Sequence, residues 1–238
     1  MSKEHIVKSF DEDLKKLDNI IAEMGGLAEV QLADAVEALI KRDTELADSV
    51  IAGDKKIDAL ESEIDNQATT TLALRQPMAD DLRATITALR AASLIERIGD
   101  YAKNIAKRSV VLSQSPPLGP AKSIARMATL VQGMIKDVLD AYVARDVDKA
   151  EAVRARDADA DLLHTSLFRE ILTYMMEDPR TITSCTHLLF VAKNLERIGD
   201  HATNIAELVY YLVKGVPPMD EREKSDASSF TVVDLDGD

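Results

Sequence analysis

Four pairs of acidic residues in this chain share one spacing, in which the second acid follows the first by four positions. The pairs are Asp54 with Asp58, Glu96 with Asp100, Asp157 with Asp161, and Glu196 with Asp200. Residues four apart lie on one face of a helix, so each pair would present two carboxylates together. Carboxylate oxygens are ligands for hard cations such as Mg²⁺, Mn²⁺, Ca²⁺ or ferric iron. The spacing therefore predicts sites for divalent or trivalent metal ions, with Mg, Mn or Fe expected.

The same pairs have a second interpretation as ordinary solvated acids. Asp and Glu make up 42 of the 238 residues, so several pairs at this spacing are expected by chance. Two like charges four positions apart destabilise a helix by roughly 0.2–0.5 kcal/mol, and a bound cation would reverse the sign of that effect. Aligned pairs in both halves of the chain favour metal binding. On the residues alone, both interpretations stay open.

The chain contains an internal repeat. The pentapeptide Glu-Arg-Ile-Gly-Asp occupies residues 96–100 and again 196–200, and each copy is followed by a matching Asn-Ile-Ala. Further upstream the two halves align at an offset of 103 residues, which places residues 38–43 opposite 141–146. The same offset places Asp54 opposite Asp157 and Asp58 opposite Asp161. Self-similarity of this extent indicates a tandem duplication.

Composition and breakers predict an all-α fold. Apolar residues make up 46% of the chain and aromatic residues only 4%, so the core must be aliphatic. Pro and Gly divide each half into three long segments with helical periodicity, and no strand-like alternation persists. We expect helices at 5–41, 44–74, 78–112, 119–144, 147–176 and 180–213. These form two tandem three-helix bundles, six long helices in all, related by the internal duplication.

We expect three parts along the chain: a first bundle at 1–115, a second at 116–215, and an acidic tail at 216–238 that is disordered. Asp43 and Asp146 are natural N-caps for the middle helix of each bundle. Gly99 and Gly199 fall inside helices, where glycine costs about 1 kcal/mol relative to alanine, and close helix packing is the favoured reason for both.

The predicted third helix of the first bundle carries its acids away from its apolar stripe. Leu94, Ile98 and Ile105 lie nearly opposite Glu96 and Asp100 on a helical projection. We therefore expect the carboxylates on the outside of the bundle, with up to four assembled in each half if the middle and third helices are neighbours. His164 follows Asp161 by three positions and is within reach of that patch, although a surface position is favoured for it and for His201.

Charge and cysteine content exclude several classes of protein. The net charge of −13 disfavours binding to nucleic acid. Cys185 is the single cysteine, no apolar leader begins the chain, and no apolar run is long enough to span a membrane. We expect a protein of the reducing cytoplasm with no direct membrane insertion.

Familiar catalytic arrangements are missing from the sequence. No Glu-x-x-His pair, phosphate-cradling Gly loop or nucleophile elbow is present, so we expect no enzymatic activity. Two alternatives remain beside a metal-binding scaffold. One is a metal-dependent hydrolase or oxidase that uses the carboxylate clusters, and the other is a helical adaptor that binds no metal.

The chain resembles the PhoU family of phosphate-specific transport system accessory proteins over about residues 5–215. The resemblance is carried by ordered motifs: Met24-Gly25-Gly26, Gly53-Asp54 with Asp58, Arg75-Gln76-Pro77 with Asp81-Leu82-Arg83, Leu94-x-Glu96-Arg97-Ile98-Gly99-Asp100, Tyr174-Met175-Met176-Glu177-Asp178 and Leu195-Glu196-Arg197-Ile198-Gly199-Asp200-His201. The acidic segment after Gly215 is not part of the shared pattern.

This resemblance implies a function that composition cannot give. PhoU-like proteins are cytoplasmic, often dimeric, and built from two three-helix bundles. They act as negative regulators of the phosphate-starvation response and of phosphate uptake, linking the ATPase of the phosphate ABC transporter to a sensor histidine kinase. Some members bind multinuclear metal clusters through Glu/Asp-x-x-x-Asp pairs, which correspond to the four pairs named above.

Overall fold

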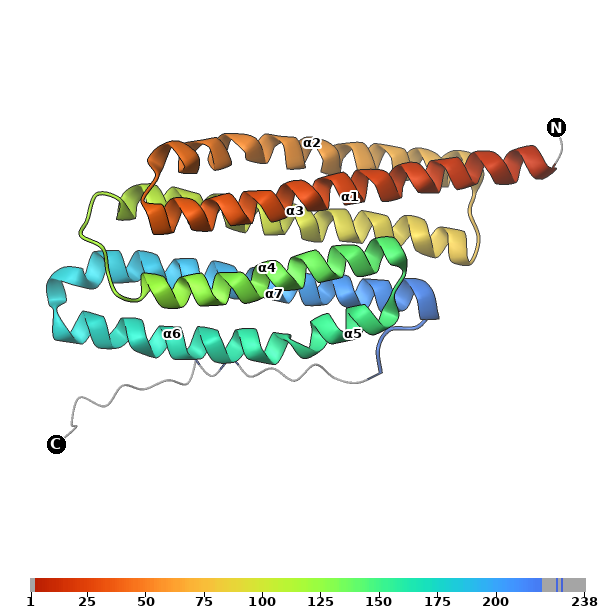
Figure 1. Ribbon diagram of the computed structural model, residues 1–238. Helices are drawn as coiled ribbons and strands as arrows, with labels where there is room; N and C mark the ends of the chain where they lie inside the picture. Colours follow the sequence, from red (N-terminus) through yellow and green to blue (C-terminus); the bar gives the residue numbers. More distant parts are fainter. Residues whose placement is uncertain (1–2, 220–225, 227, 229–238) are drawn as a thin grey trace.

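The computed structural model describes residues 3–219 together with 226 and 228, and side chains from residue 12 onward. The first lobe consists of three long helices, α1 Lys3–Lys41, α2 Thr44–Arg75 and α3 Asp80–Leu112. Each packs against both of the others to form a three-helix bundle (Figure 1). Residues 113–120 then lead into the second lobe.

The second lobe repeats this arrangement with one interruption. It contains α4 Ala121–Ala144, α5 Val147–Ala155, α6 Asp157–Glu177, the 3₁₀ turn η1 Pro179–Thr181 and α7 Ile182–Lys214. Figure 1 shows α5 and α6 as consecutive segments of one helical arm, opposite α4 and α7. The predicted class is confirmed: the described residues form an all-α fold with six long arms in two three-helix bundles.

The prediction of one uninterrupted helix at 147–176 is wrong, because the helix breaks at Arg156 between α5 and α6. The N–H of Arg156 donates to the carbonyl of Val153 at 3.1 Å, which is the tighter three-residue turn that ends α5. The guanidinium of Arg156 also forms an ion pair with Asp137 on α4. No Pro or Gly marks this position, so the break has no local signal in the sequence.

The middle arms begin where the sequence predicts. The carboxylate of Asp43 accepts a hydrogen bond from the N–H of Leu46 at 2.9 Å, and Asp146 accepts one from Lys149 at 3.0 Å. These equivalent caps satisfy N–H groups in the first turn of α2 and of α5.

The two lobes pack through equivalent helices, α1 against α4 and α3 against α7. Helices α3 and α7 run antiparallel, because Arg83 near the start of α3 lies over the ring of Tyr211 near the end of α7. At the other end, Arg108 lies over the ring of Phe190 at 4.1 Å. The repeats are thus related by an approximate twofold axis that crosses the middle of α3 and α7.

A single aliphatic core extends through both lobes, with Ile, Leu, Val, Ala and Met as its main residues. Small residues allow the lobes to approach closely, since a Cβ added at Gly25 of α1 would lie 2.5 Å from Cδ2 of Leu139 on α4. None of the helices in the described part of the chain is long and apolar enough to cross a membrane. The tail predicted at 216–238 lies largely outside the described residues.

Candidate functional site

Five carboxylates gather on the first lobe where α2 packs against α3. We call this set the first acidic cluster; it consists of Asp54, Asp58, Glu61, Glu96 and Asp100. Burial raises the pKa of Asp58, and the nearby charges of Asp54 and Asp100 raise it further. Burial likewise raises the pKa of Glu61, with added repulsion from Asp65, Asp58 and Asp100. These side chains therefore repel one another across the two helices.

Lys103 on α3 neutralises part of this cluster. Its Nζ lies 2.6 Å from Oδ1 of Asp100 and also forms an ion pair with Oδ2 of Asp54. Asp54 is only 4% exposed, and its other oxygen accepts a hydrogen bond from Nε2 of Gln31 on α1 at 3.2 Å. The ammonium group thus bridges α2 and α3 at the centre of the first acidic cluster.

Glu96 is the carboxylate of this cluster with the largest change in pKa. Burial, followed by the charge of Asp100 and a hydrogen bond with it, raises the pKa of Glu96 to about 7. Burial works in the same direction on Asp100, but hydrogen bonds from Lys103 and Glu96 outweigh it and lower the pKa of Asp100. The pair therefore takes up a proton as the pH falls through about 7.

A corresponding cluster lies on the second lobe where α6 packs against α7. We call it the second acidic cluster; it consists of Asp157, Asp161, Glu196, Asp200 and Asp226. A pocket of about 330 Å³ is lined by Asp161, Lys193, Glu196, Arg197, Asp200 and Asp226. Asp157 is buried beside Thr203, whose Oγ1 donates to Oδ1 of Asp157 at 3.1 Å. The second cluster thus has its own cavity and a carboxylate from outside the helical bundle.

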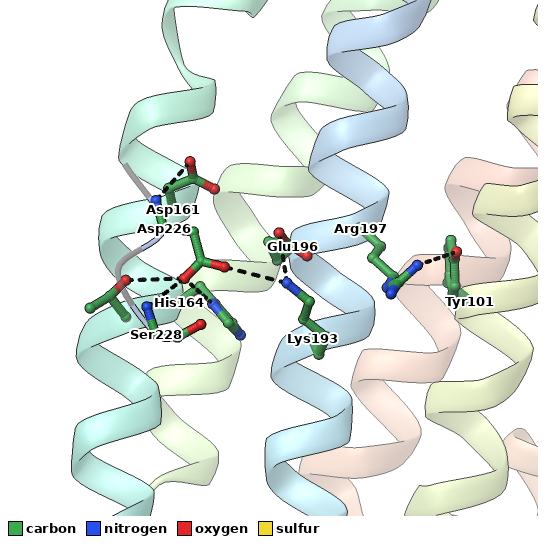
Figure 2. Close-up of polar contacts among 9 residues, drawn as sticks. Tyr101, Asp161, His164, Lys193, Glu196, Arg197, Asp226 and Ser228 are labelled. Carbon is green, nitrogen blue, oxygen red and sulfur yellow. Dashed lines mark hydrogen bonds and ion pairs between the residues drawn. The ribbon is translucent and has the colours of Figure 1, made fainter. Parts of the chain in front are cut away.

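Asp226 reaches the second cluster from the segment after α7 (Figure 2). Its backbone N–H donates to Oδ2 of Asp161 at 3.2 Å, and its Oδ2 lies 3.4 Å from Nζ of Lys193. Its Oδ1 lies 3.4 Å from Nδ1 of His164 and accepts from the N–H of Ser228 at 2.9 Å. Despite its partial burial, hydrogen bonds from Ser228 and the charges of His164 and Lys193 lower the pKa of Asp226.

Glu196 carries a buried oxygen that lacks a hydrogen-bond partner among the described residues. Its Oε1 forms an ion pair with Nζ of Lys193 at 2.9 Å, whereas Oε2 is buried and makes no hydrogen bond. Burial raises the pKa of Glu196, and although Lys193 opposes this, the charge of Asp200 adds to it. A buried carboxylate oxygen without a partner is costly unless a ligand completes it.

The prediction that the acids lie outside the bundle is wrong for half of them. Four of the predicted ligands are buried, namely Asp54, Asp157, Asp161 and Glu196. Asp58 is exposed, while Glu96, Asp100 and Asp200 are half-buried. Three of these four lie on the middle arms, α2 and α6, which pack against the third helix of their lobe, so their acidic face is turned toward a neighbouring helix and not toward solvent.

Sequence reasoning missed Glu61, Lys103, Lys193 and Asp226. Glu61 continues the stripe of Asp54 and Asp58 by three positions, so the helical spacing contained that signal. The surface position favoured for His164 is also wrong, because this side chain is 4% exposed and lies beside Asp226. His201 is half-buried and stacks on Tyr101 with ring centroids 5.6 Å apart.

Both clusters fit a hard cation in donor type and charge. Within the residues that the structure describes, no three His, Cys, Asp or Glu side chains converge as a ready-made metal site. In each lobe a lysine ammonium lies among the carboxylates instead, Lys103 in the first and Lys193 in the second. Lysine is a single charge on a flexible side chain, so it can swing away, and a metal cation in its place would contact the same carboxylates. The unpartnered Oε2 of Glu196 is one oxygen available to such a cation.

Curated relatives match this chain along almost their whole length. The "Phosphate-specific transport system accessory protein PhoU homolog" of Caulobacter vibrioides is 52% identical over 95% of this chain and 99% of the relative. The protein of the same name from Rhizobium meliloti is 51% identical over 96% of this chain and 97% of the relative.

Solved structures agree with these relatives. The crystal structure of PhoU from Pseudomonas aeruginosa superposes with a TM-score of 0.84 at 41% identity, covering 87% of this chain and all of that one. The phosphate transport system regulatory protein PhoU from Streptococcus pneumoniae gives 0.80 at 29% identity, covering 88% and 99%. The PhoU domain matches twice, at residues 21–109 and 124–209, once in each lobe. The chain belongs to the PhoU family.

Proposed function

We propose that this protein is a negative regulator of phosphate uptake and of the phosphate-starvation response. It acts in the cytoplasm as an adaptor between the ATPase of the phosphate ABC transporter and a sensor histidine kinase. The observation that carries this proposal is 52% identity over 99% of a relative named as a phosphate-specific transport system accessory protein. Similarity over the full length of the relative supports an accessory role in phosphate transport, and the link to a kinase is our proposal.

Regulation by an adaptor needs a protein whose binding to one partner changes its binding to the other. Two packed lobes with a charged cluster on each suit such a role, because cation binding would stiffen the contact between the arms of each lobe. We propose that the clusters hold Mg²⁺, Mn²⁺ or iron. The ligands are Asp54, Asp58, Glu96 and Asp100 in the first lobe, and Asp157, Asp161, Glu196 and Asp200 in the second.

The adaptor role predicts two physical partners. Affinity capture of the tagged protein from cells grown with ample phosphate should recover the transporter ATPase and the histidine kinase. Deletion of the gene should raise expression of phosphate-starvation genes under the same conditions, and the wild-type copy should restore repression. Failure to recover either partner, together with unchanged expression in the deletion strain, would contradict the proposal.

Metal binding can be tested separately from regulation. The Glu196→Ala/Asp200→Ala variant should lose stoichiometric metal in the second lobe after dialysis, measured by elemental analysis of protein purified without chelator. The exposed residue Asp159 on α6 provides a control, since Asp159→Ala removes a carboxylate outside the pocket. Unchanged metal content in the double variant would show that the ligands are assigned wrongly.

We also propose a homodimer and no enzymatic activity. Light scattering after size-exclusion chromatography should give twice the chain mass of 26.1 kDa. Metal-loaded protein should show no turnover of phosphoesters and no oxygen consumption. Robust turnover that disappears in the Asp100→Asn and Asp200→Asn variants would instead support a metal-dependent hydrolase or oxidase.

A further inference from the structure

The two acidic clusters differ at one equivalent position of the repeat. The offset of 103 residues that aligns Asp58 with Asp161 also aligns Glu61 with His164. Glu61 contributes the fifth carboxylate of the first cluster, where it interacts with Asp58 and Asp100. In the second lobe the imidazole of His164 stands at that position, so the helical repeat there contributes four carboxylates.

Asp226 brings a carboxylate to the place where the second lobe lacks one. Its Oδ1 lies 3.4 Å from Nδ1 of His164 and 3.5 Å from Oγ1 of Thr165, directly over this part of α6. With Asp226 included, each cluster again contains five carboxylates. Figure 2 shows Asp226 between Asp161 and His164 on α6 and Lys193 on α7.

The position of Asp226 is fixed through its backbone as well as its charge. Its N–H is bound by Asp161, and its own carboxylate caps the N–H of Ser228 at 2.9 Å, which forms a local turn. The side chain is 17% exposed. The carboxylate of Asp226 is therefore held at the pocket both by this turn and by the charges of Lys193 and His164.

The pocket beneath Asp226 has the properties of a cation site. Four carboxylates line it, from Asp161, Glu196, Asp200 and Asp226, against the two cationic side chains of Lys193 and Arg197. Arg197 is directed toward the hydroxyl of Tyr101, to which it donates at 3.5 Å. The buried Oε2 of Glu196 makes no hydrogen bond to the described residues, and Glu196 is only 7% exposed. The pocket volume of about 330 Å³ leaves room for an ion with bound water.

We propose that Asp226 is a ligand that the C-terminal segment supplies to the cation site of the second lobe, in place of the carboxylate that Glu61 provides in the first. This inference rests on the proposed binding of cations to the clusters. The bound species is a hard divalent cation held by carboxylate oxygens. Cation binding by the second lobe therefore depends on the segment after α7, whereas binding by the first lobe does not.

The test uses the full-length chain and Mn²⁺ alone. Glu96→Gln/Asp100→Asn removes the first site, so that a titration followed by the electron paramagnetic resonance signal of free Mn²⁺ reports on the second. In this background Asp226→Asn should weaken binding by about tenfold or more, as expected for loss of one charged ligand. Asp159→Asn, the same charge change on an exposed residue of α6, should leave the affinity unchanged.

A compensating variant separates a ligand from a structural contact. His164→Glu restores the carboxylate at the repeat position, so His164→Glu/Asp226→Asn should recover most of the lost affinity. Equal Mn²⁺ affinity with and without Asp226→Asn, or failure of the compensating variant in protein that circular dichroism shows to be folded, would overturn the role of Asp226. Absence of Mn²⁺ binding with Asp226 intact would overturn the proposed cation site itself, and the inference with it.

Discussion

Tyr101 and His201 occupy equivalent positions of the repeat, and their rings stack on each other across the lobe interface. The ring centroids lie 5.6 Å apart and the ring planes differ by 14°. This pair lies at the middle of the α3–α7 contact, next in sequence to Asp100 and Asp200. The contact between the two repeats therefore lies directly beside one carboxylate of each acidic cluster, Asp100 of the first and Asp200 of the second.

Loss of this stacked pair should weaken the contact between the lobes. Tyr101→Leu is expected to lower the free energy of unfolding by about 1 kcal/mol, which is typical of an aromatic pair. Tyr101→Phe keeps the ring and loses only the hydroxyl contact with Arg197, so it should cost less than half as much. Urea unfolding followed by far-ultraviolet circular dichroism measures both, and equal losses would assign the effect to the hydroxyl.

The two glycines of the repeated pentapeptide should respond in opposite ways to alanine. A Cβ at Gly99 would lie 2.9 Å from Cδ1 of Ile57 and 3.2 Å from Oε1 of Gln31, while at Gly199 the nearest atom is 3.7 Å away. Gly99→Ala is expected to destabilise the protein by about 1 kcal/mol net of its gain in helix propensity. Gly199→Ala should stabilise it by about 1 kcal/mol. Thermal unfolding of the two variants side by side gives the comparison, and a shift of the same sign in both would refute it.

The ammonium of Lys103 should become dispensable when a cation is present. In chelator, Lys103→Met leaves the buried carboxylate of Asp54 without its ion pair and is expected to cost about 2–3 kcal/mol. Mn²⁺ should restore most of this loss by taking the place of the ammonium. Lys107→Met, one turn further along α3 at an exposed position, should change stability by less than about 0.5 kcal/mol. No rescue of Lys103→Met by Mn²⁺ would contradict cation binding in the first lobe.

Stability of the metal-free protein should depend on the protonation of Glu96. Its pKa is raised from 4.5 to about 7 in the folded protein, so the protonated form is favoured by folding. The resulting stabilisation is complete below pH 4.5 and is lost as the pH rises through about 7. Glu96→Gln cannot lose a proton, so its stability relative to wild type should increase across this range. Urea titrations in chelator at several pH values measure the difference, and a constant difference would show that Glu96 does not titrate there.

The fold was predictable because its signals are local and occur twice. The caps at Asp43 and Asp146, the turn prolines and the aliphatic stripes each specify a helix boundary or a buried face, and the repeat makes every assignment in one lobe a check on the other. The break at Arg156 was not predictable. It coincides with an ion pair to Asp137 of another helix and with a backbone turn that has no Pro or Gly, neither of which a local sequence pattern shows.

The site was predictable only in part. Spacing identified eight carboxylates as pairs, but the burial of Asp54 and Glu196 depends on which neighbouring helix covers them, and a single helical projection does not contain that information. Glu61 could have been predicted, because it follows Asp58 by three positions and lies on the same helical face. Asp226 could not, because the segment after Gly215 has no periodic pattern that would bring it to α6.

When two copies of a bundle lie in one polypeptide, the sequence of one copy can change without the same change in the other. In an assembly of identical subunits, a change from glutamate to histidine at position 61 would occur in every subunit at once. Here position 164 carries a histidine and position 61 a glutamate, so the two halves of one chain differ at this position. With cations bound as proposed, the two clusters would differ in affinity, and the protein would respond over two ranges of ion concentration.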